Sequence, residues 1–394
     1  MRSLLSQLSD APAMSASAFK TEYESVCNAE QLRPRKEVLA ACDAAAGIEA
    51  GAELRVNGNA PALRDDRLLD VDVRLLATSL AKGGHPFAAL DASYNRLGGE
   101  CADALKELLR TDSRLQALDL SYSDLGGAAA EKLCEGLREN QALRELRLSG
   151  NALGASGGMA VAEMLQVNDS IQRVYLGACE LTSETLVALA TVLRHNASVA
   201  LLDVQRPLIN SLGEEAVAHF SQMLAVNRTL VELDLSKSGM RDHGLKLIAA
   251  ELRHAPASAL KTLRLRCNQV ELKEPSCVDE VAGLFGSDGC TLAVLDLSAN
   301  RLRDEGALIF AEILQRNASL VSLDLTHNAI GTSGLCMLGH VCASHDGGLL
   351  QEVRLSGNRF DSAACRAWLP SLSAGMALDF TVQEVDGLFH AAGL

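Results

Sequence analysis

The chain contains 394 residues, with 50 Asp and Glu against 36 Lys and Arg, so its formal net charge at pH 7 is −14. This charge makes nucleic acid a poor partner and favours basic segments of other proteins. Apolar residues make up 48% of the chain and aromatic residues only 3%, a balance typical of a core built from leucine and alanine.

Residues 1–18 are small and polar, and we expect them to form a disordered tail. They contain no long apolar run, so they predict neither a signal peptide nor a membrane anchor. We expect a cytoplasmic protein that does not bind a membrane.

Residues 19–50 are predicted to form an N-terminal helical cap. Apolar residues recur at helical spacing from Phe19 to Cys27. A second helix is predicted from Pro34, which suits a first turn, to Gly47, which suits a helix end. Such a cap covers the first edge and the first apolar layer of a repeat array.

A motif recurs along the middle of the chain, and its clearest copy spans residues 292–302. Three leucines at 292, 295 and 297, followed by Asn300 and Leu302, match L-x-x-L-x-L-x-x-N-x-L, the signature of a leucine-rich repeat. The Asn suits the turn after a short strand, because its side chain can satisfy free backbone groups. A weak first copy surrounds Leu54, and further copies begin at Phe87, Leu115, Leu143, Ile171, Val199, Leu230, Leu260, Leu292, Leu320 and Leu350.

The segments between the copies have helical spacing, as in GECADALKELLR and EGALIFAEILQR. A helix is about 10 Å wide whereas strands pair about 4.8 Å apart, so stacked units must curve with the strands inside. We predict an α/β fold, a leucine-rich-repeat solenoid of the ribonuclease-inhibitor-like horseshoe type with a concave parallel β-sheet and convex α-helices. It should span residues 51–360 as a single domain.

Residues 361–394 are predicted to form a C-terminal cap. A helix begins at Asp361, carries the chain's only tryptophan, Trp368, and is expected to be interrupted by Pro370. Alternating apolar residues over 378–382 predict one closing strand, followed by a turn at Asp386 and Gly387.

Several other features have a structural interpretation. The glycine-rich segment Gly150 to Gly158 lacks the Gly-Lys-Ser/Thr end of a phosphate-binding loop and fits a tight strand-to-helix turn. Four Asn-x-Ser/Thr sequons follow predicted helices, where Asn is expected as a left-handed helix cap rather than as a glycosylation site. These sequons begin at Asn168, Asn196, Asn227 and Asn317.

The cysteines and histidines form no recognisable site. The chain has eleven Cys and no C-x-x-C pair, which favours an intracellular protein without disulfides or a zinc site. Several of these cysteines, such as Cys101, Cys134, Cys336 and Cys342, lie in helical segments as small apolar groups. No Ser/His/Asp or Cys/His arrangement stands out, so we expect no catalytic residues, no metal and no cofactor.

The outward residue between the two core leucines of each strand is often acidic. Asp203 and Asp234 are expected to be neighbours, as are Asp296 and Asp324, and adjacent like charges do not stabilise a sheet. Two insertions, at 206–213 and 270–276, are expected to rim the same region and to mark the binding face. The candidate partner-binding residues are Asp203, Arg206, Asn210, Asp234, Arg264, Glu271, Lys273, Asp296 and Asp324. A solvated acidic surface with drifting loops remains the alternative.

Four segments carry a family resemblance: GNALGASGGMAVAEMLQVNDS at 150–170, DVQRPL at 203–208, GNRFDSAAC at 357–365 and VDG at 385–387. They resemble the leucine-rich repeat-containing protein 34 family over roughly residues 19–394. The resemblance implies a non-enzymatic protein of motile cilia, associated with axonemal radial spokes. It also implies a looser association with the nucleolus and with pluripotent cells.

Three functions therefore compete. The first is a non-catalytic scaffold subunit of a ciliary or flagellar axonemal complex, bound to basic segments of protein partners. The second is a regulator of small GTPases similar to the Ran GTPase-activating protein, although residues 371–394 are not the acidic tail typical of such proteins. The third is a soluble inhibitor or sensor that uses the concave face.

Overall fold

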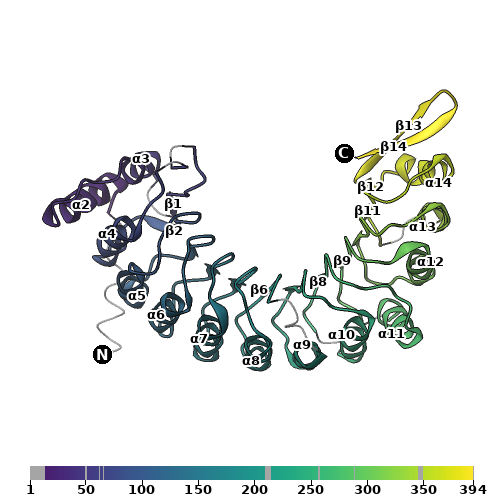
Figure 1. The fold of residues 1–394 in the computed structure, drawn as a ribbon, viewed down its shortest axis with the longest axis horizontal. Coiled ribbons are helices and arrows are strands. Elements are labelled where there is room, and N and C mark those ends of the chain that lie inside the picture. The colour runs from purple at the N-terminus through teal and green to yellow at the C-terminus, as the bar shows by residue number, and fades with distance from the viewer. Residues whose placement is uncertain are drawn as a thin grey trace. The chain divides into compact units, whose positions relative to one another are not determined.

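A computed structural model describes residues 14–393 except 49–50, 62, 65, 209–213, 256–257, 288 and 345–348. The chain divides into two compact units, Met1–Val204 and Gln205–Leu394. Each unit consists of short parallel strands followed by helices (Figure 1). The prediction of an α/β leucine-rich-repeat solenoid is confirmed. The predicted boundaries between cap, repeats and second cap remain a prediction.

The described residues of the first unit form six strands, each parallel to the next one in the chain. The strands are β1 (Ala52–Arg55), β2 (Phe87–Asp91), β3 (Ala117–Asp119), β4 (Glu145–Arg147), β5 (Arg173–Tyr175) and β6 (Leu201–Asp203). The helices are α2 (Ala16–Ala29), α3 (Lys36–Ala44), α4 (Asp70–Ala81), α5 (Ala102–Thr111), α6 (Gly127–Leu137), α7 (Gly154–Val167) and α8 (Ser183–Leu193). Helices α4 to α8 cover one face of the strands and leave the other face open (Figure 1).

The second unit repeats this arrangement with another six parallel strands. They are β7 (Glu232–Asp234), β8 (Thr262–Arg264), β9 (Val294–Asp296), β10 (Ser322–Asp324), β11 (Glu352–Arg354) and β12 (Ala377–Leu378). The helices are α9 (Glu214–Val226), α10 (Asp242–His254), α11 (Pro275–Phe285), α12 (Arg303–Leu314), α13 (Thr332–Ser344) and α14 (Ser362–Ser373). An antiparallel hairpin of β13 (Phe380–Val385) and β14 (Leu388–Gly393) follows.

The core lies between the strands and the helices, where the repeat predicts it. Leu295 is 2% exposed and Leu297 is fully buried, whereas Asp296 between them is half-buried on the open face of the sheet. The predicted register is therefore confirmed. Burial of one leucine side chain contributes about 1.5–3 kcal/mol, so the repeated leucines dominate the stability of both units.

The turn after each strand is held by the repeated asparagine. The Asn151 amide nitrogen donates to the carbonyl oxygens of Leu120 and Leu148, both at 2.8 Å. Its amide oxygen accepts the backbone N–H groups of Ser123 and Leu125. A buried turn would otherwise leave these groups unsatisfied, which confirms the structural role predicted for this residue.

The asparagines that follow the helices form a second polar ladder, but the predicted left-handed cap is wrong. Asn168 has a φ of −85°, which is extended rather than left-handed backbone. Asn168 is 1% exposed. Its amide nitrogen donates to the carbonyl oxygens of Leu137 and Asn140. Its amide oxygen accepts the backbone N–H groups of Ser170 and Ile171. The Asn168 side chain therefore stabilises the end of α7 by hydrogen bonds to the preceding repeat, without a left-handed backbone conformation.

At the N-terminus α2 begins at Ala16, within the predicted tail, and the helix predicted from Pro34 to Gly47 is shorter, Lys36–Ala44. The C-terminal elements form with two differences. The predicted interruption at Pro370 is wrong: helix α14 continues through it to Ser373, although proline has no backbone N–H to donate there. The predicted closing strand is two strands, since Asp379 breaks it by accepting the N–H groups of Leu355 and Ser356. The predicted turn at Asp386 and Gly387 is confirmed, with both residues at positive φ between β13 and β14.

Candidate protein-binding surface

The open face of the sheet, away from the helices, presents the last residue of each strand. We call these residues the strand-end residues. In the first unit they are Arg55, Asp91, Asp119, Arg147, Tyr175 and Asp203. In the second unit they are Asp234, Arg264, Asp296, Asp324 and Arg354. Helices cover the other face, so in each unit these side chains are the strand residues open to a partner.

In the second unit two carboxylates lie side by side. Asp296 and Asp324 are direct partners in the register of β9 and β10. Burial raises the pKa of the Asp324 carboxyl above its usual value of 3.8, the Asp296 charge raises it further, and backbone N–H donation opposes both. A cationic group bound between the two carboxylates would remove this repulsion.

Cationic strand-end residues flank the acidic pair. Arg264 lies in register between Asp234 and Asp296 and forms an ion pair with Glu232. Arg354 is in register with Asp324 and pairs with Glu352 at 2.7 Å. Each of these arginines therefore has a glutamate as its ion-pair partner, whereas Asp296 and Asp324 lie side by side as like charges.

These aspartates also have a structural role that the sequence reasoning missed. The Asp296 carboxylate accepts the N–H of Ser298 at 2.8 Å, and Asp324 accepts the N–H of Thr326 at 2.9 Å. Asp119 and Asp234 bond the residue two positions later in the same way. The recurring Asp-Leu-Ser/Thr pattern was the signal that could have revealed it.

In the first unit charged residues at both ends of the strands form ion pairs within and between strands. Glu145 accepts from Arg147 on its own strand and from Arg173 on the next, the latter at 2.6 Å. The Arg147 guanidinium lies 4.2 Å from the centre of the Tyr175 ring. Arg55 pairs with Asp91 at 3.2 Å. The first unit also has two adjacent strand-end carboxylates, Asp91 and Asp119, but Arg55 pairs with Asp91.

Two stacked tyrosines border this face of the first unit, and sequence reasoning missed them. Tyr94 and Tyr122 have ring centres 4.8 Å apart and planes 10° apart. Both have positive φ, and Tyr122 is 46% exposed. The next repeat has Gly150 at the matching position, where a Cβ would collide with the Tyr122 ring. Tyrosine before the turn residue in two successive repeats, followed by glycine in the third, was the available signal.

The structure distributes the predicted partner-binding residues between the units. Asp203 belongs to the first unit and is 8% exposed, whereas Asp234, Arg264, Asp296 and Asp324 belong to the second. The predicted neighbours Asp296 and Asp324 do lie together. Arg206 is exposed at a φ of 51°. Asn210 lies outside the described residues.

The second predicted insertion is an ordered loop. The Asp242 carboxylate at the start of α10 accepts the backbone N–H groups of Glu271, Leu272, Lys273 and Glu274. These four donors hold the pKa of Asp242 below its usual value against the opposing effect of burial. Glu271 and Lys273 pair with each other at 2.7 Å. Asp242 of the preceding repeat therefore holds the backbone of this loop in place.

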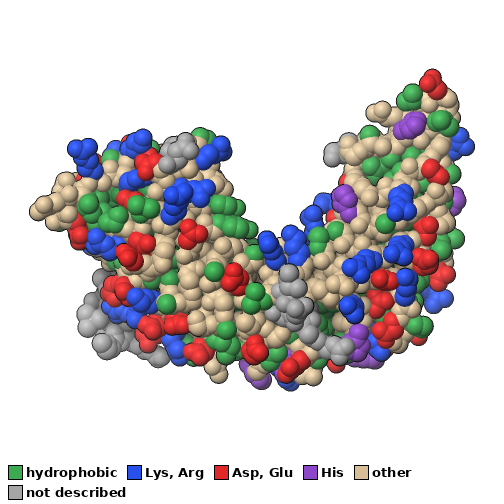
Figure 2. Space-filling model, in the orientation of Figure 1, with side chains coloured by type: hydrophobic (Ala, Val, Ile, Leu, Met, Phe, Trp, Pro, Cys, Tyr) green, Lys and Arg blue, Asp and Glu red, His purple; other side chains and the backbone are tan. Residues whose placement is uncertain are grey.

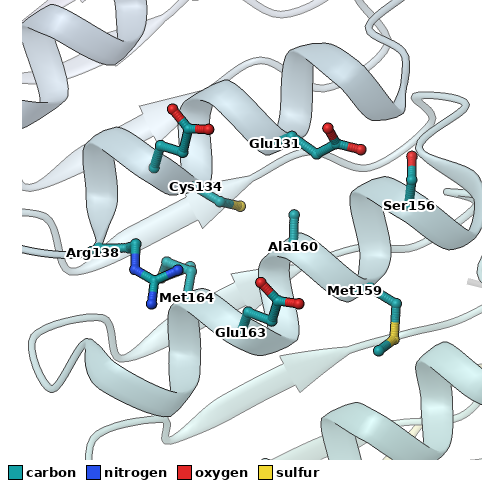
Figure 3. A pocket seen from close by; sticks show the side chains of 9 residues that line it. Glu131, Cys134, Arg138, Ser156, Met159, Ala160, Glu163 and Met164 are labelled. Atoms are coloured by element: carbon teal, nitrogen blue, oxygen red, sulfur yellow. The ribbon is translucent and has the colours of Figure 1, made fainter.

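The helical side of the first unit has a hollow of about 290 Å³ between α6 and α7 (Figure 3). The acidic side chains of Glu131 and Glu163 line it together with Arg138. Burial raises the pKa of the neighbouring Cys134 thiol to about 12, so this cysteine is a poor nucleophile at neutral pH. Acidic and basic side chains are interspersed over the surface (Figure 2), and this hollow continues that pattern.

All eleven cysteines are free thiols. Burial raises the pKa of Cys179 and Cys342 to about 12, as it does for Cys134. Within the described ranges no three His, Cys, Asp or Glu side chains are grouped to hold a metal ion. In that same part of the chain no helix has the length and apolar character needed to span a bilayer.

Five segments match the family model described as Leucine Rich repeat: residues 113–134, 139–162, 226–249, 290–311 and 316–339. They alternate with segments that the model does not match but that contain the same strands and helices. The repeat therefore extends beyond the matched residues.

Several curated proteins are similar to part of the chain. NACHT, LRR and PYD domains-containing protein 12 of Mus musculus is 29% identical over 47% of this chain and 19% of its own length. Leucine-rich repeat-containing protein 34 of Mus musculus is 30% identical over 44% of this chain and 40% of its own length. Ribonuclease inhibitor of Sus scrofa is 31% identical over 38% of this chain and 32% of its own length. The chain thus spans well under two thirds of each relative.

Among solved structures, an internalin from Listeria monocytogenes aligns over 95% of this chain and 100% of that chain, with 14% identity and a TM-score of 0.46. The five matched segments, the register and the parallel strands are those of a leucine-rich-repeat solenoid, and part of the chain is similar to ribonuclease inhibitor.

Proposed function

We propose that this leucine-rich-repeat chain is a non-catalytic structural subunit of a ciliary or flagellar axonemal complex, such as a radial spoke. It binds a basic segment of a neighbouring protein through the open sheet face of its second unit. The side-by-side carboxylates of Asp296 and Asp324 carry the proposal. The resemblance to the leucine-rich repeat-containing protein 34 family supports the axonemal location, and the mouse protein of that name is 30% identical in the matched region.

The acidic pair favours a basic partner for an electrostatic reason. Two adjacent carboxylates cost a few tenths of a kcal/mol in an isolated sheet, and a bound lysine or arginine converts that cost into attraction. The net charge of −14 adds long-range attraction for a cationic segment.

The test separates the negative charge of the two aspartates from the turn hydrogen bonds that they accept. Asp296→Asn with Asp324→Asn removes both charges, while each Asn oxygen can still accept the N–H that the Asp accepts. A tagged copy in a ciliated cell should lose most of its incorporation into isolated axonemes, and its thermal unfolding should be unchanged. The matched control is Glu305→Gln with Glu312→Gln, which removes two exposed charges from α12 on the helical side.

The outcomes separate the two parts of the proposal. If the wild-type chain is absent from axonemes, the axonemal assignment is wrong. If the wild type incorporates and the double Asn variant incorporates equally well, the contact is not at the acidic pair.

A soluble inhibitor or sensor is the second candidate, favoured by the match to ribonuclease inhibitor. Such a protein would remain in the soluble fraction and would bind one enzyme or effector through the same face. Regulation of small GTPases is the remaining alternative. It predicts that the purified chain accelerates GTP hydrolysis by a Ran-type GTPase at least a hundredfold, whereas a scaffold leaves the rate unchanged.

A further inference from the structure

Three successive turns at the start of the second unit carry basic side chains. Arg206 lies in the first of these turns, Lys237 lies in the turn after β7, and Arg266 lies in the turn after β8. We call these three the basic turn residues, and all of them are exposed. Residues 205–208, 236–239 and 266–269 contain no Asp or Glu, although the chain has 50 acidic residues. The turns are therefore a positively charged patch on an acidic protein.

Backbone hydrogen bonds hold the basic turn residues next to one another. The Arg206 N–H donates to the carbonyl oxygen of Ser236 at 2.8 Å. The Lys237 N–H donates in the same way to the carbonyl oxygen of Arg266, also at 2.8 Å. Arg206 and Lys237 share the left-handed backbone conformation, with φ of 51° and 56°. Because neighbouring strands lie about 4.8 Å apart, the three turns together span about 10 Å.

No described carboxylate forms an ion pair with the basic turn residues. The ion pairs among the described residues of the second unit use five other cations, namely Lys246, Arg253, Arg264, Lys273 and Arg354. Asp234 at the end of β7 offsets one of the three positive charges at most. Adjacent like charges repel each other, so an anion bound across the turns replaces repulsion with attraction.

The size of the patch selects the kind of anion. Arg and Lys side chains donate charge-assisted hydrogen bonds to carboxylates. In an extended segment, alternate side chains lie on one face about 6.7 Å apart, so carboxylates at alternate positions match three turns that span about 10 Å. Nucleic acid carries a charge on every phosphate and would continue from the patch onto the acidic surface of the chain. A short acidic segment of a protein fits better, because its charge ends with the patch.

We propose that the basic turn residues bind an acidic segment of a protein partner, extended across the three turns with its carboxylates paired to Arg206, Lys237 and Arg266. Charge complementarity of this kind sets the partner and its register. The contact goes beyond the basic segment proposed for Asp296 and Asp324, because it involves other residues and the opposite charge.

The test uses a labelled peptide with acidic residues at alternate positions. Capped Glu-Ser-Glu-Ser-Glu should bind the 394-residue chain saturably at low ionic strength, as measured by fluorescence anisotropy. The capped peptide Gln-Ser-Gln-Ser-Gln has the same length without the charge, and we expect its binding to be at least tenfold weaker. Added salt should weaken the binding of the Glu peptide, because the contacts are exposed.

Variants then locate the peptide. Lys237→Gln with Arg266→Gln should weaken binding of the Glu peptide at least tenfold. The thermal unfolding of this variant should be unchanged, because the turn hydrogen bonds use backbone groups. The matched control is Lys261→Gln with Arg316→Gln, which removes two exposed positive charges before β8 and after α12 and should leave binding unchanged. If the first variant fails to fold, Arg206→Gln decides, with at least a threefold loss expected.

A second control separates this contact from the proposed function. Asp296→Asn with Asp324→Asn should bind the Glu peptide at least as well as the wild type does, because it removes only negative charge. A loss of binding in this variant would mean that the acidic pair and the basic turn residues do not act as separate sites, which contradicts the proposal.

Four further results would overturn the proposal. Equal binding of the Glu and Gln peptides would mean that the turns do not recognise charge. Undiminished binding to Lys237→Gln with Arg266→Gln, or an equal loss in the matched control, would place the peptide elsewhere. The absence of saturable binding to the wild type would remove the site. Tighter binding of a labelled oligothymidylate than of the Glu peptide would assign the turns to nucleic acid.

Discussion

The open sheet faces of the two units differ although their backbones follow the same repeat. In the first unit Glu145 bridges Arg147 and Arg173, and Arg147 also stacks on Tyr175. In the second unit Asp296 and Asp324 are adjacent like charges, and neither forms an ion pair with another described residue. The first unit also has an adjacent pair, Asp91 and Asp119, but there Asp91 pairs with Arg55. Both strand sets bury the same leucine pattern, so the core does not dictate the strand-end residues. The open face can vary independently of the fold, which makes the acidic pair informative.

The largest expected effect tests whether the cores are equivalent. Leu118→Ala in the first unit and Leu295→Ala in the second both remove fully or almost fully buried side chains. Each should lower the free energy of unfolding by about 2–5 kcal/mol, because a cavity remains where the side chain packed. Urea denaturation measures both. A decrease in unfolding free energy of less than about 1 kcal/mol for only one of the two variants would mean that the cores of the two units are not equally well packed.

A smaller effect is expected where the second unit fixes its insertion. Asp242→Asn keeps one acceptor oxygen but cannot bond all four N–H groups of residues 271–274. We expect a loss of about 1–3 kcal/mol near neutral pH, the cost of unsatisfied donors.

This loss should depend on pH in a defined direction. The pKa of Asp242 is lowered in the folded chain, so its contribution is complete above the unfolded value of 3.8 and disappears as pH falls through the folded value. The difference between wild type and variant, measured by urea denaturation, should shrink as the pH falls below 3.8. A difference that stays constant there would mean that the carboxylate charge is not responsible.

In the first unit the stacked tyrosines predict a comparable or smaller effect. Gly150→Ala should cost about 1–3 kcal/mol, because the backbone φ is +74° and the new Cβ meets the Tyr122 ring. Gly150→Ala combined with Tyr122→Ala should recover the part of the loss that comes from the ring. Thermal unfolding of the three variants separates the two causes, and additive losses would mean that ring and Cβ do not meet.

The smallest expected effect concerns the acidic pair itself. Asp324→Asn should leave the free energy of unfolding unchanged or raise it by less than about 1 kcal/mol, since it removes repulsion from Asp296 and keeps an acceptor for Thr326. The folded pKa of Asp324 is raised, so the wild type should lose stability as pH rises from 3.8 through that value, and the variant should not. Denaturation across this pH range checks the sign.

Asp296→Ala provides the contrasting result. From sequence alone this position on the open face would be expected to change stability by no more than about half a kcal/mol. The structure raises the expectation to about 1 kcal/mol, because the N–H of Ser298 loses its acceptor. Asp296→Asn should lie within half a kcal/mol of the wild type. Equal losses for the Ala and Asn variants would show that charge, not the turn hydrogen bond, matters there.

The sequence by itself determined the repeat, the register and the buried layer. Leu295 and Leu297 could be assigned to the core because strand periodicity is local, and Asn151 to the turn because its hydrogen-bonding role recurs in every regular repeat. The acidic pair of Asp296 and Asp324 followed from the same register.

Only the tertiary structure decided which side chains reach the neighbouring repeat. Asp242 binds N–H groups about thirty residues away, Tyr122 lies over Gly150, and Asp379 splits the closing strand by bonding Leu355. Periodicity predicts which face of a strand or helix a residue occupies. Contacts between repeats depend instead on how one repeat stacks on the next, because a single backbone N–H group or a missing Cβ determines which side chain fits there.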